Sequence, residues 1–376
     1  MTFVGSKISR TCLVIGILLA SVSAANAQIW QGSTAAFGQP TVFEWTETGN
    51  WSPASAPVTG SGLPAEFRNI GATSVTVNGG SQATTLTFAG GVANNASVYT
   101  FGGVGLSVTS AIANNSTNNQ TFNNQIDFTA GTRSISNTST GSLIFNSSVN
   151  NSGNIINVSN SVAGGSILFN GNVTANTVAV SGSGTVRLGN GGETFSGAVI
   201  AAGSTRVEGV GTVNGLTTIG SGASYSAGQT GVASGVGAQI LTGLTFDAKA
   251  AGPTANFVWD LASPASFDTI NLNNSALTIG SGFLTQINLG ATLPTTESVF
   301  NVFTNFNVGT SNLANLTSSL FNIVGPNPLN HTFSWRIDGN TASIVAVPEP
   351  SSMALLGMAG LIGGVYARRR AKKNQA

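Results

Sequence analysis

The sequence predicts an all-β protein: a right-handed β-solenoid, or β-helix, with terminal caps, a cleavable N-terminal signal peptide and a C-terminal transmembrane helix. Short segments such as 74–77 and 142–145 are rich in β-branched residues and alternate apolar with polar positions. Similar segments recur at the period of a solenoid rung, with glycine at each corner. Only 7% of the residues are charged, where about 25% is usual. The mean hydropathy is nevertheless positive, so the chain can bury a core.

The expected organisation has five parts. They are the signal peptide at 1–27, an N-terminal cap at 28–73, β-solenoid repeats at 74–239, a C-terminal β cap region at 240–346, and a sorting signal at 347–373 whose transmembrane helix is 351–367. Basic residues flank apolar segments at both ends, while the middle is rich in Gly, Asn, Ser and Thr. No segment of the middle keeps a helical period with caps.

The first residues are typical of a secretory signal peptide. Lys7 and Arg10 form a basic region, and the apolar segment 12–20 that follows is too short to anchor in a membrane. Ala25 and Ala27 then provide an Ala-x-Ala cleavage site. We therefore expect export by the Sec translocon and cleavage by signal peptidase directly after Ala27. The alternative is an N-terminal anchor that is never cleaved.

Composition excludes several kinds of chemistry. Cys12 is the only cysteine and lies in the predicted signal peptide. The mature protein therefore has no disulfide, no thiolate metal site and no cysteine nucleophile. Between residues 28 and 346, six basic residues stand against eleven acidic ones. Because phosphate binding needs clustered basic residues, this mildly acidic body is not expected to bind nucleic acid.

Three tryptophans characterise the predicted N-terminal cap: Trp30, Trp45 and Trp51. Prolines with interleaved Gly and Ser break the same segment into loops. One interpretation is an aromatic platform that stacks on sugar rings. The other, which we favour, is a cap whose tryptophans cover the open end of the β-stack, because a terminal repeat lacks a neighbour on one side.

The repeats are recognised by strands that recur in register after a glycine. The aligned segments are spaced by 24, 19, 19 and 19 residues, and they are 141–145, 165–169, 184–188, 203–207 and 222–226. Periods of about 20 residues are what a β-solenoid rung requires. A single rung leaves open backbone edges, so it is stable only when stacked. The spacing also predicts that Arg187 and Arg206 stack on successive rungs, as part of a solvated face.

Residues 184–207 run through a Gly-rich turn, an aromatic residue before Ser-Gly, and a valine-rich strand. This pattern is similar to the autotransporter-associated β-strand repeat, which implies a fold and no particular activity. An autotransporter continues into a membrane barrel of alternating strands. Here we expect a cap and a sorting tail instead, so export through a barrel of its own is not supported. The strands expected in the cap are 257–261, 269–272, 276–279, 299–303, 332–337 and 342–346.

The carboxyl end carries a pattern of three parts. Its motif consists of Val347, Pro348, Glu349 and Pro350, and the two prolines predict a stiff, exposed and non-helical peptide. The uncharged segment 351–367 follows, and its 17 residues are at the short end of what spans a bilayer as a helix. A basic stop-transfer cluster comes next, made of Arg368, Arg369 and Arg370. Because such basic flanks stay cytoplasmic, the motif should face outward.

This order of motif, apolar span and arginine cluster resembles the PEP-CTERM sorting domain of Gram-negative exoproteins, over residues 347–373. The resemblance implies recognition by exosortase, a membrane-embedded cysteine transpeptidase-like enzyme, and removal of the tail near the motif. It also implies an inner-membrane intermediate, followed by release or attachment at the surface of a cell that makes extracellular polysaccharide. The alternative is a plain tail anchor that is never processed.

Side chains for catalysis or ligand binding are scarce. The single histidine, His331, lies in an expected turn, so we assign it neither catalysis nor metal binding. Asp260 and Asp268 are the best carboxylate pair, placed to face each other across a hairpin. Glycoside hydrolysis needs two carboxylates at a set separation, but we expect these two to cap the turn. No catalytic, cofactor-binding or metal-binding residue is predicted, and no cofactor.

Two function classes remain. The first, which we favour, is a non-enzymatic exported protein of the cell surface or extracellular matrix, sorted by exosortase and associated with exopolysaccharide, as in a biofilm. The alternative is a β-helix carbohydrate-active enzyme, either a polysaccharide lyase or a glycoside hydrolase. The scarcity of His, Lys and paired acids in the repeats favours the first class.

Overall fold

The computed structural model describes most of the chain between Ala27 and Glu349. The described residues are 27–31, 42–46, 50–52, 57, 62–69, 73–229, 236–249, 255–290, 293–317, 319–327, 329–349 and 358. Within them the regular structure consists of strands with almost no helix, which confirms the all-β prediction. The predicted signal peptide lies outside the described residues apart from Ala27, and the predicted transmembrane helix lies outside them apart from Met358.

The described strands form two sheets. Sheet A contains 20 strands: β1 (Gln28–Trp30), β3 (Trp51–Ser52), β4 (Ala65–Phe67), β6 (Gln82–Phe88), β8 (Leu106–Asn114), β10 (Ile126–Phe128), β11 (Arg133–Asn137), β13 (Val149–Asn160), β15 (Val173–Gly182), β17 (Thr194–Phe195), β18 (Ala198–Ala201), β20 (Thr212–Val213), β21 (Thr217–Ile219), β23 (Ala238–Leu241), β24 (Leu244–Phe246), β27 (Thr269–Ser275), β28 (Leu277–Ile279), β30 (Ser298–Phe306), β32 (Thr332–Asp338) and β33 (Thr341–Val347). Sheet B contains 13 strands: β2 (Val42–Glu44), β5 (Ser74–Val77), β7 (Tyr99–Gly103), β9 (Gln120–Phe122), β12 (Ser142–Phe145), β14 (Ser166–Phe169), β16 (Thr185–Leu188), β19 (Arg206–Gly209), β22 (Ser224–Ala227), β25 (Phe257–Ser263), β26 (Ser266–Phe267), β29 (Leu284–Leu289) and β31 (Leu320–Val324).

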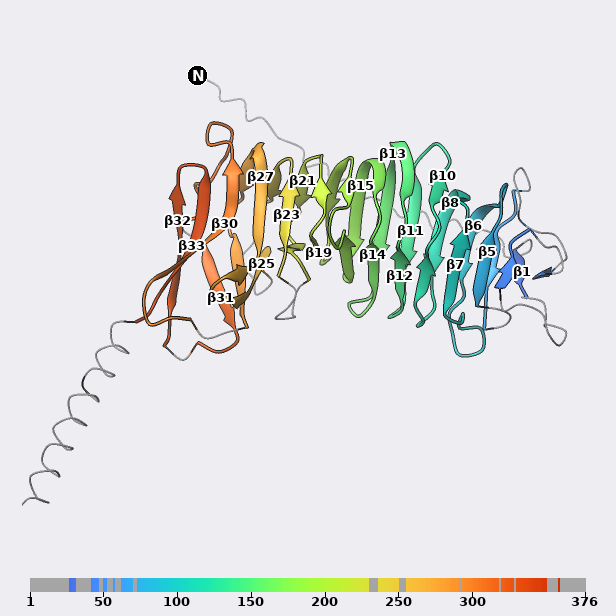
Figure 1. The fold of residues 1–376 in the computed structure, drawn as a ribbon, viewed down its shortest axis with the longest axis horizontal. Coiled ribbons are helices and arrows are strands. Elements are labelled where there is room, and N and C mark those ends of the chain that lie inside the picture. Colours follow the sequence, from blue (N-terminus) through green and yellow to red (C-terminus); the bar gives the residue numbers. More distant parts are fainter. Residues whose placement is uncertain are drawn as a thin grey trace, which may run out of the picture.

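Each sheet grows by parallel pairing between successive passes of the chain. In sheet B, β12 pairs with β9 on one side and with β14 on the other, where Ser142 lies opposite Ser166. In sheet A, β13 pairs in the same way with β11 and β15. The chain therefore passes back and forth between the two sheets. The strands stand side by side along the long axis of the molecule, from β1 at one end to β32 and β33 at the other (Figure 1).

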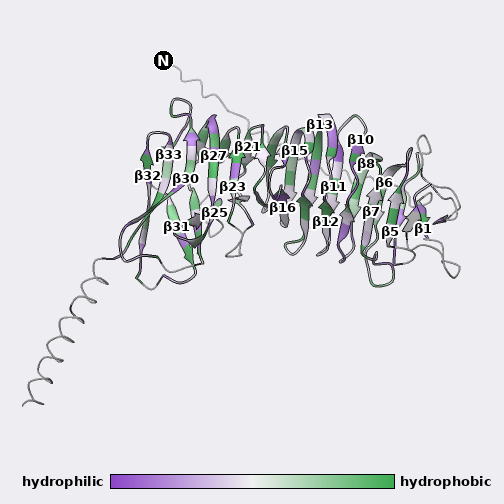
Figure 2. Ribbon diagram, viewed as in Figure 1, coloured by the Kyte–Doolittle hydropathy of each residue, from purple (hydrophilic) through white to green (hydrophobic). Residues whose placement is uncertain are grey.

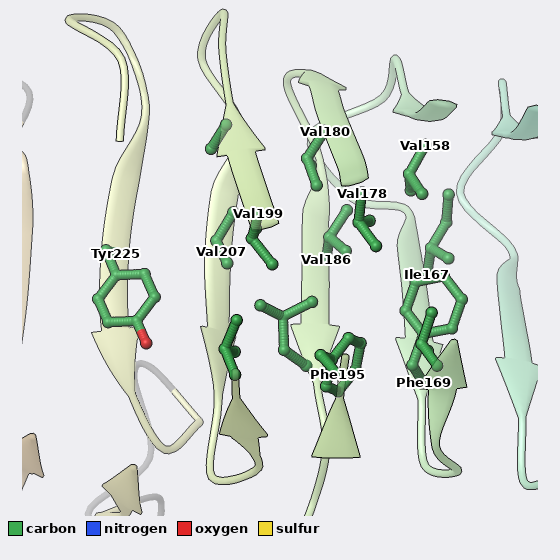
Figure 3. Close-up of a cluster of buried hydrophobic side chains, with 14 of the residues drawn as sticks. Val158, Ile167, Phe169, Val178, Val180, Val186, Phe195, Val199, Val207 and Tyr225 are labelled. Atoms are coloured by element: carbon green, nitrogen blue, oxygen red, sulfur yellow. The ribbon is translucent and has the colours of Figure 1, made fainter. Parts of the chain in front are cut away.

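Period-two alternation places the core between the sheets. Hydrophobic and hydrophilic residues alternate along the strands (Figure 2), and the burial pattern of β12, β14 and β16 alternates in step with them. Val186 and Val207 from sheet B and Val178 and Val199 from sheet A point into the shared core (Figure 3). A single cluster of buried side chains extends from Trp30 at one end to Ala346 at the other. Apolar burial on this scale is the main force that holds the strands together.

A stack of phenylalanine rings fills the core beneath sheet B. The rings of Phe101, Phe122, Phe145 and Phe169 lie nearly parallel, with successive centroids 4.8, 5.1 and 5.3 Å apart. These spacings follow from the strand register, because parallel pairing puts equivalent residues of neighbouring strands at about 4.8 Å. All four side chains are buried. The stack ties four consecutive strands of sheet B to one another.

A row of buried asparagines runs beside this stack at a corner of sheet A. Asn114, Asn137 and Asn160 lie opposite one another and are each 0% exposed. Asn114 donates to the side-chain oxygen of Asn137 at 3.2 Å, and Asn137 donates to that of Asn160 at 3.3 Å. An amide has both donors and an acceptor, so identical residues can satisfy one another inside the protein. The row ends at Gly182, where φ is +114° and a Cβ would lie 2.0 Å from the carbonyl oxygen of Asn160.

Antiparallel strands occur at both ends of the described body. At the amino end β1 pairs with β3, and at the carboxyl end β33 lies between β30 and β32. Between these ends the sheet A pairings are parallel, and they continue from β20 and β21 to β23 and β24. Parallel pairing therefore continues across residue 239, where the sequence predicts that the repeats end and the C-terminal cap begins. The domain boundaries stay a prediction.

The predicted register is correct for the first repeats and wrong for the later ones. Ser142 lies opposite Ser166, and Ser166 opposite Thr185, as the 24- and 19-residue spacings require. Thr185, however, lies opposite Arg206, two residues later than predicted. The turn after β16 contains additional residues, including Gly191 and Gly192 with positive φ. Arg187 and Arg206 are therefore not stacked on each other, which corrects the sequence-based expectation.

Candidate functional site

The carboxyl end of the body is a central strand followed directly by the predicted sorting motif. β33 forms antiparallel pairs with β30 on one side and with β32 on the other, up to Val347 opposite Thr332. Ala342, Ile344 and Ala346 from this strand are 0% exposed. Pro348 and Glu349 follow without regular structure, as predicted. The strand is thus fixed in the core immediately before the motif begins.

The exposure predicted for the motif is wrong in part. Val347 is exposed and Glu349 is half-buried, but Pro348 is buried. The reason is its position, since it follows a strand that is itself inside the sheet rather than at an edge. Pro350, the basic cluster of Arg368 to Arg370 and the last residues of the chain lie outside the described residues. A protease or transpeptidase that needs an extended substrate must first draw Pro348 away from the body.

The amino end of the body begins at the predicted cleavage site. Ala27 precedes β1, and the first strand residue, Gln28, donates its backbone N–H to the carbonyl oxygen of Pro64 at 2.9 Å. Gln28 also lies opposite Ala65 in parallel pairing. Cleavage after Ala27 would leave the α-amino group of Gln28 at the position of this donor. Ala25 lies outside the described residues, so the cleavage itself stays a prediction.

The comparison with protein families decides the nature of the carboxyl end. Residues 346–370 match the PEP-CTERM protein-sorting motif. The match begins at Ala346 inside β33 and covers the predicted apolar span and arginine cluster. The PEP-CTERM motif makes this chain an exported protein that passes through the membrane and is sorted to the cell surface as a substrate of exosortase. No curated protein matches the chain.

The predicted transmembrane helix of the sorting signal lies almost entirely outside the described residues. Within the part of the chain that the structure describes, no helix is long and apolar enough to cross a membrane. The segment 351–367 falls outside that part apart from Met358, so its helical conformation stays a prediction. The autotransporter-like repeat also has no support from the comparisons and stays a resemblance.

The carboxylate pair forms as the sequence suggests, but deep in the protein. β25 and β26 form the predicted hairpin, and the N–H of Asp268 donates to the carbonyl oxygen of Asp260 at 3.0 Å. One carboxylate oxygen of Asp268 accepts from the N–H of Gly237 at 2.9 Å. The other accepts from the N–H of Asp260 at 3.0 Å and the hydroxyl of Ser226 at 3.2 Å. Asn288 donates to Asp260 at 2.6 Å.

The surroundings of this pair suit a structural role. Asp260 and Asp268 are 3% and 0% exposed, so a polysaccharide chain would reach them only if the body opened. Their hydrogen bonds join β25 to β22, β29 and the turn before β23. Asp268 thus links several passes of the chain, which is what a turn-capping carboxylate does. Two of its hydrogen-bond partners are Ser226 and Gly237, and no pattern in the sequence indicates that either residue contacts Asp268.

Burial raises the pKa of Asp268 to about 8, and the nearby Asp260 contributes to the rise, while the bonds from Gly237, Asp260 and Ser226 partly offset it. An unfolded chain titrates an aspartate near pH 4. The folded state therefore retains a proton that the unfolded state releases between about pH 4 and pH 8, and the stability from this group is fully present only below that range. We expect the free energy of unfolding to fall by about 1 kcal/mol per pH unit across it. Urea denaturation at several pH values measures this slope.

The variant Asp268→Asn tests whether Asp268 causes this fall of the unfolding free energy with pH. It cannot ionise, so its stability should change less with pH than that of the unchanged protein. Asp247→Asn is the matched control, because Asp247 is exposed and its replacement should leave the slope intact. Equal slopes in Asp268→Asn and the unchanged protein would contradict the assignment.

The remaining candidates are also built into the body. His331 is 3% exposed, with its ring nitrogens 3.0 Å from the side-chain oxygen of Asn327 and 2.9 Å from the carbonyl oxygen of Pro294. It thereby joins the 327–331 turn to a second loop. Among the described residues no group of three or more His, Cys, Asp and Glu side chains could hold a metal ion.

The aromatic platform interpretation of the N-terminal tryptophans is wrong. Trp30, Trp45 and Trp51 are 0%, 0% and 2% exposed. Trp51 meets Trp30 and Trp45 edge to face, with ring centroids 5.0 and 4.9 Å apart. The indole N–H of Trp51 donates to the carbonyl oxygen of Trp45, and Phe67 packs against all three rings. The rings fill the core at the end of the stack and offer no open face to a sugar.

Proposed function

We propose that this protein is a non-enzymatic structural or interaction protein of the cell surface or extracellular matrix. Its body is a right-handed β-solenoid with a cap at each end, and exosortase processes its tail. The body is associated with exopolysaccharide. Export uses the Sec translocon and signal peptidase, and the host is Gram-negative. The observation that carries the proposal is an elongated body of mostly parallel strands whose last strand, the antiparallel β33, runs into a PEP-CTERM motif.

The outer surface of the ladder supports an interaction role. Amides form rows that run across the strands, as in the exposed Asn123 and Asn146 and the half-buried Asn170, where each side chain bonds to the next at 2.8 and 2.9 Å. Hydroxyl groups do the same at Ser142 and Ser166, which are 2.6 Å apart. Amides and hydroxyls are the groups that exchange hydrogen bonds with sugar hydroxyls. Such rows repeat at the strand spacing and suit a long, polar, repetitive partner.

Processing is tested by fractionating the native host and mapping the termini of the protein by mass spectrometry. We expect extracellular material that starts at Gln28 and ends close to Pro348. Replacing Glu349 by alanine should leave an unprocessed chain in the inner membrane. Glu297→Ala is the matched control, since Glu297 is an exposed acid of the body. An intact tail in the inner membrane of the unchanged strain would show a tail-anchored protein and defeat the proposal.

The carbohydrate-active enzyme is the alternative, and the same purified material tests it. The released body is incubated with the exopolysaccharide of its host, and chain length is followed by size-exclusion chromatography. We expect no shortening. Depolymerisation that disappears in Asp260→Asn would replace the structural role by an enzymatic one.

A further inference from the structure

A polar groove lies on the outer face of sheet B, across β14, β16 and β19. Its volume is about 360 Å³, within the range of small-molecule sites. The turn around Gly164 forms one wall, Gln229 forms another, and Ser166, Thr185 and Arg206 are part of the lining. A second hollow of about 170 Å³ shares Arg187 and Gln229 with it and continues toward the turn at Asn190. The two together run along the strands.

The inward residues of β16 and β19 explain why charged side chains line the groove. Val186 and Val207 point into the core (Figure 3). Their neighbours at alternate positions therefore face outward, and the register brings Thr185 opposite Arg206. The groove depends on this register, which the sequence-based alignment placed two residues away.

One charge in the groove has no partner among the described residues. Arg187 contacts a single carboxylate oxygen of Glu208 at 3.0 and 2.8 Å, and Glu208 is only 3% exposed. Within the described residues, Arg206 makes no hydrogen bond and no ion pair, although it is half-buried. The five N–H donors of its guanidinium are therefore open to a ligand or to water. The groove thus offers one available cation beside an internal ion pair.

We propose that this groove binds an acidic saccharide, with the guanidinium of Arg206 receiving the carboxylate of a uronic acid residue. Guanidinium and carboxylate pair through two parallel hydrogen bonds. The hydroxyls of Ser166 and Thr185 and the amide of Gln229 supply partners for the sugar hydroxyls. This inference rests on the proposed association with exopolysaccharide and names its chemical class. The lining is too polar for a lipid, and a single available cation does not suit a nucleic acid.

Isothermal titration calorimetry of the full chain in detergent micelles tests the proposal, with trigalacturonate as the acidic probe and maltotriose as the neutral one. We expect saturable binding of trigalacturonate and none of maltotriose. Arg206→Gln should weaken the binding about tenfold or more, because it removes a charge-assisted pair. Arg336→Gln is the matched control, since Arg336 is an exposed arginine of β32. The melting temperature of each variant shows that the fold is kept.

Several results would overturn the groove assignment. They are unchanged affinity in Arg206→Gln, equal binding of maltotriose, or sulfate binding as tightly as trigalacturonate, which would reveal a general anion site. The outcome is separable from the proposed function. A protein found at the cell surface without Arg206-dependent binding keeps its surface role and loses this site. Arg206-dependent binding by a chain that stays in the inner membrane would keep the site and remove the surface role.

Discussion

Replacing Phe145 by alanine is expected to lower the free energy of unfolding by about 3–5 kcal/mol, the usual cost of this truncation in a packed core. Phe145 is buried between Phe122 and Phe169, with nearly parallel rings on both sides. The cavity cannot close easily, since the neighbouring rings are fixed by strands that pair on either side of β12. Urea denaturation followed by circular dichroism measures the loss.

Two control variants separate packing from local strand damage. Phe145→Leu retains most of the apolar volume and should cost clearly less than Phe145→Ala. Asn146→Ala changes the next residue along the chain, which is exposed and belongs to an outer amide row. Its expected cost is about 0.5 kcal/mol or less, as for most surface changes. If Phe145→Ala were as mild as Asn146→Ala, the ring stack would not be a major source of stability.

Ending the chain at Asn340 is expected to unfold the carboxyl end of the body. This truncation removes β33, which pairs with β30 and β32 and buries Ile344 in the core. The loss is on the order of 5 kcal/mol when several buried apolar side chains and two rows of backbone hydrogen bonds are counted. Hydrogen exchange followed by mass spectrometry should show lost protection in β30 and β32.

A chain that ends at Glu349 is the matched control for this truncation. It keeps β33 and Pro348 and lacks only the tail, so protection in β30 and β32 should equal that of the full chain. Among the described residues the last strand ends at Val347, so a chain that ends at Glu349 retains every described strand of the body. Lost protection in the chain ending at Glu349 would show that the tail supports the body.

The proposed processing would also change the charge of the protein. Most of the basic residues of the chain lie in its two ends, and the body between residues 28 and 346 has six basic residues against eleven acidic ones. Residues 28–346 alone are therefore mildly acidic, although the whole chain carries a formal net charge of +1. A local site such as Arg206, rather than the field of the whole body, must provide any attraction for an acidic saccharide.

The sequence by itself determined the features that depend on neighbouring residues. Alternation of apolar and polar side chains predicts strands at 74–77 and 142–145, because successive residues of a strand face opposite sides. The sorting motif and the arginine cluster are likewise recognisable from residue order alone, since short linear signals need no partner in the fold.

Only the tertiary structure decided the features that depend on the length of each turn. Two additional residues after β16 move Arg206 opposite Thr185 and bring Glu208 to Arg187, which creates the groove. The asparagines at 114, 137 and 160 are no different from the many others in the sequence until the register puts them in contact inside the core. The structure likewise places the three tryptophans and Asp268 in the core, whereas the sequence also allowed them to be groups that contact a ligand. Such contacts join residues from different passes of the chain. Which residues meet depends on the number of residues in every turn between them, and the local sequence pattern does not give that number.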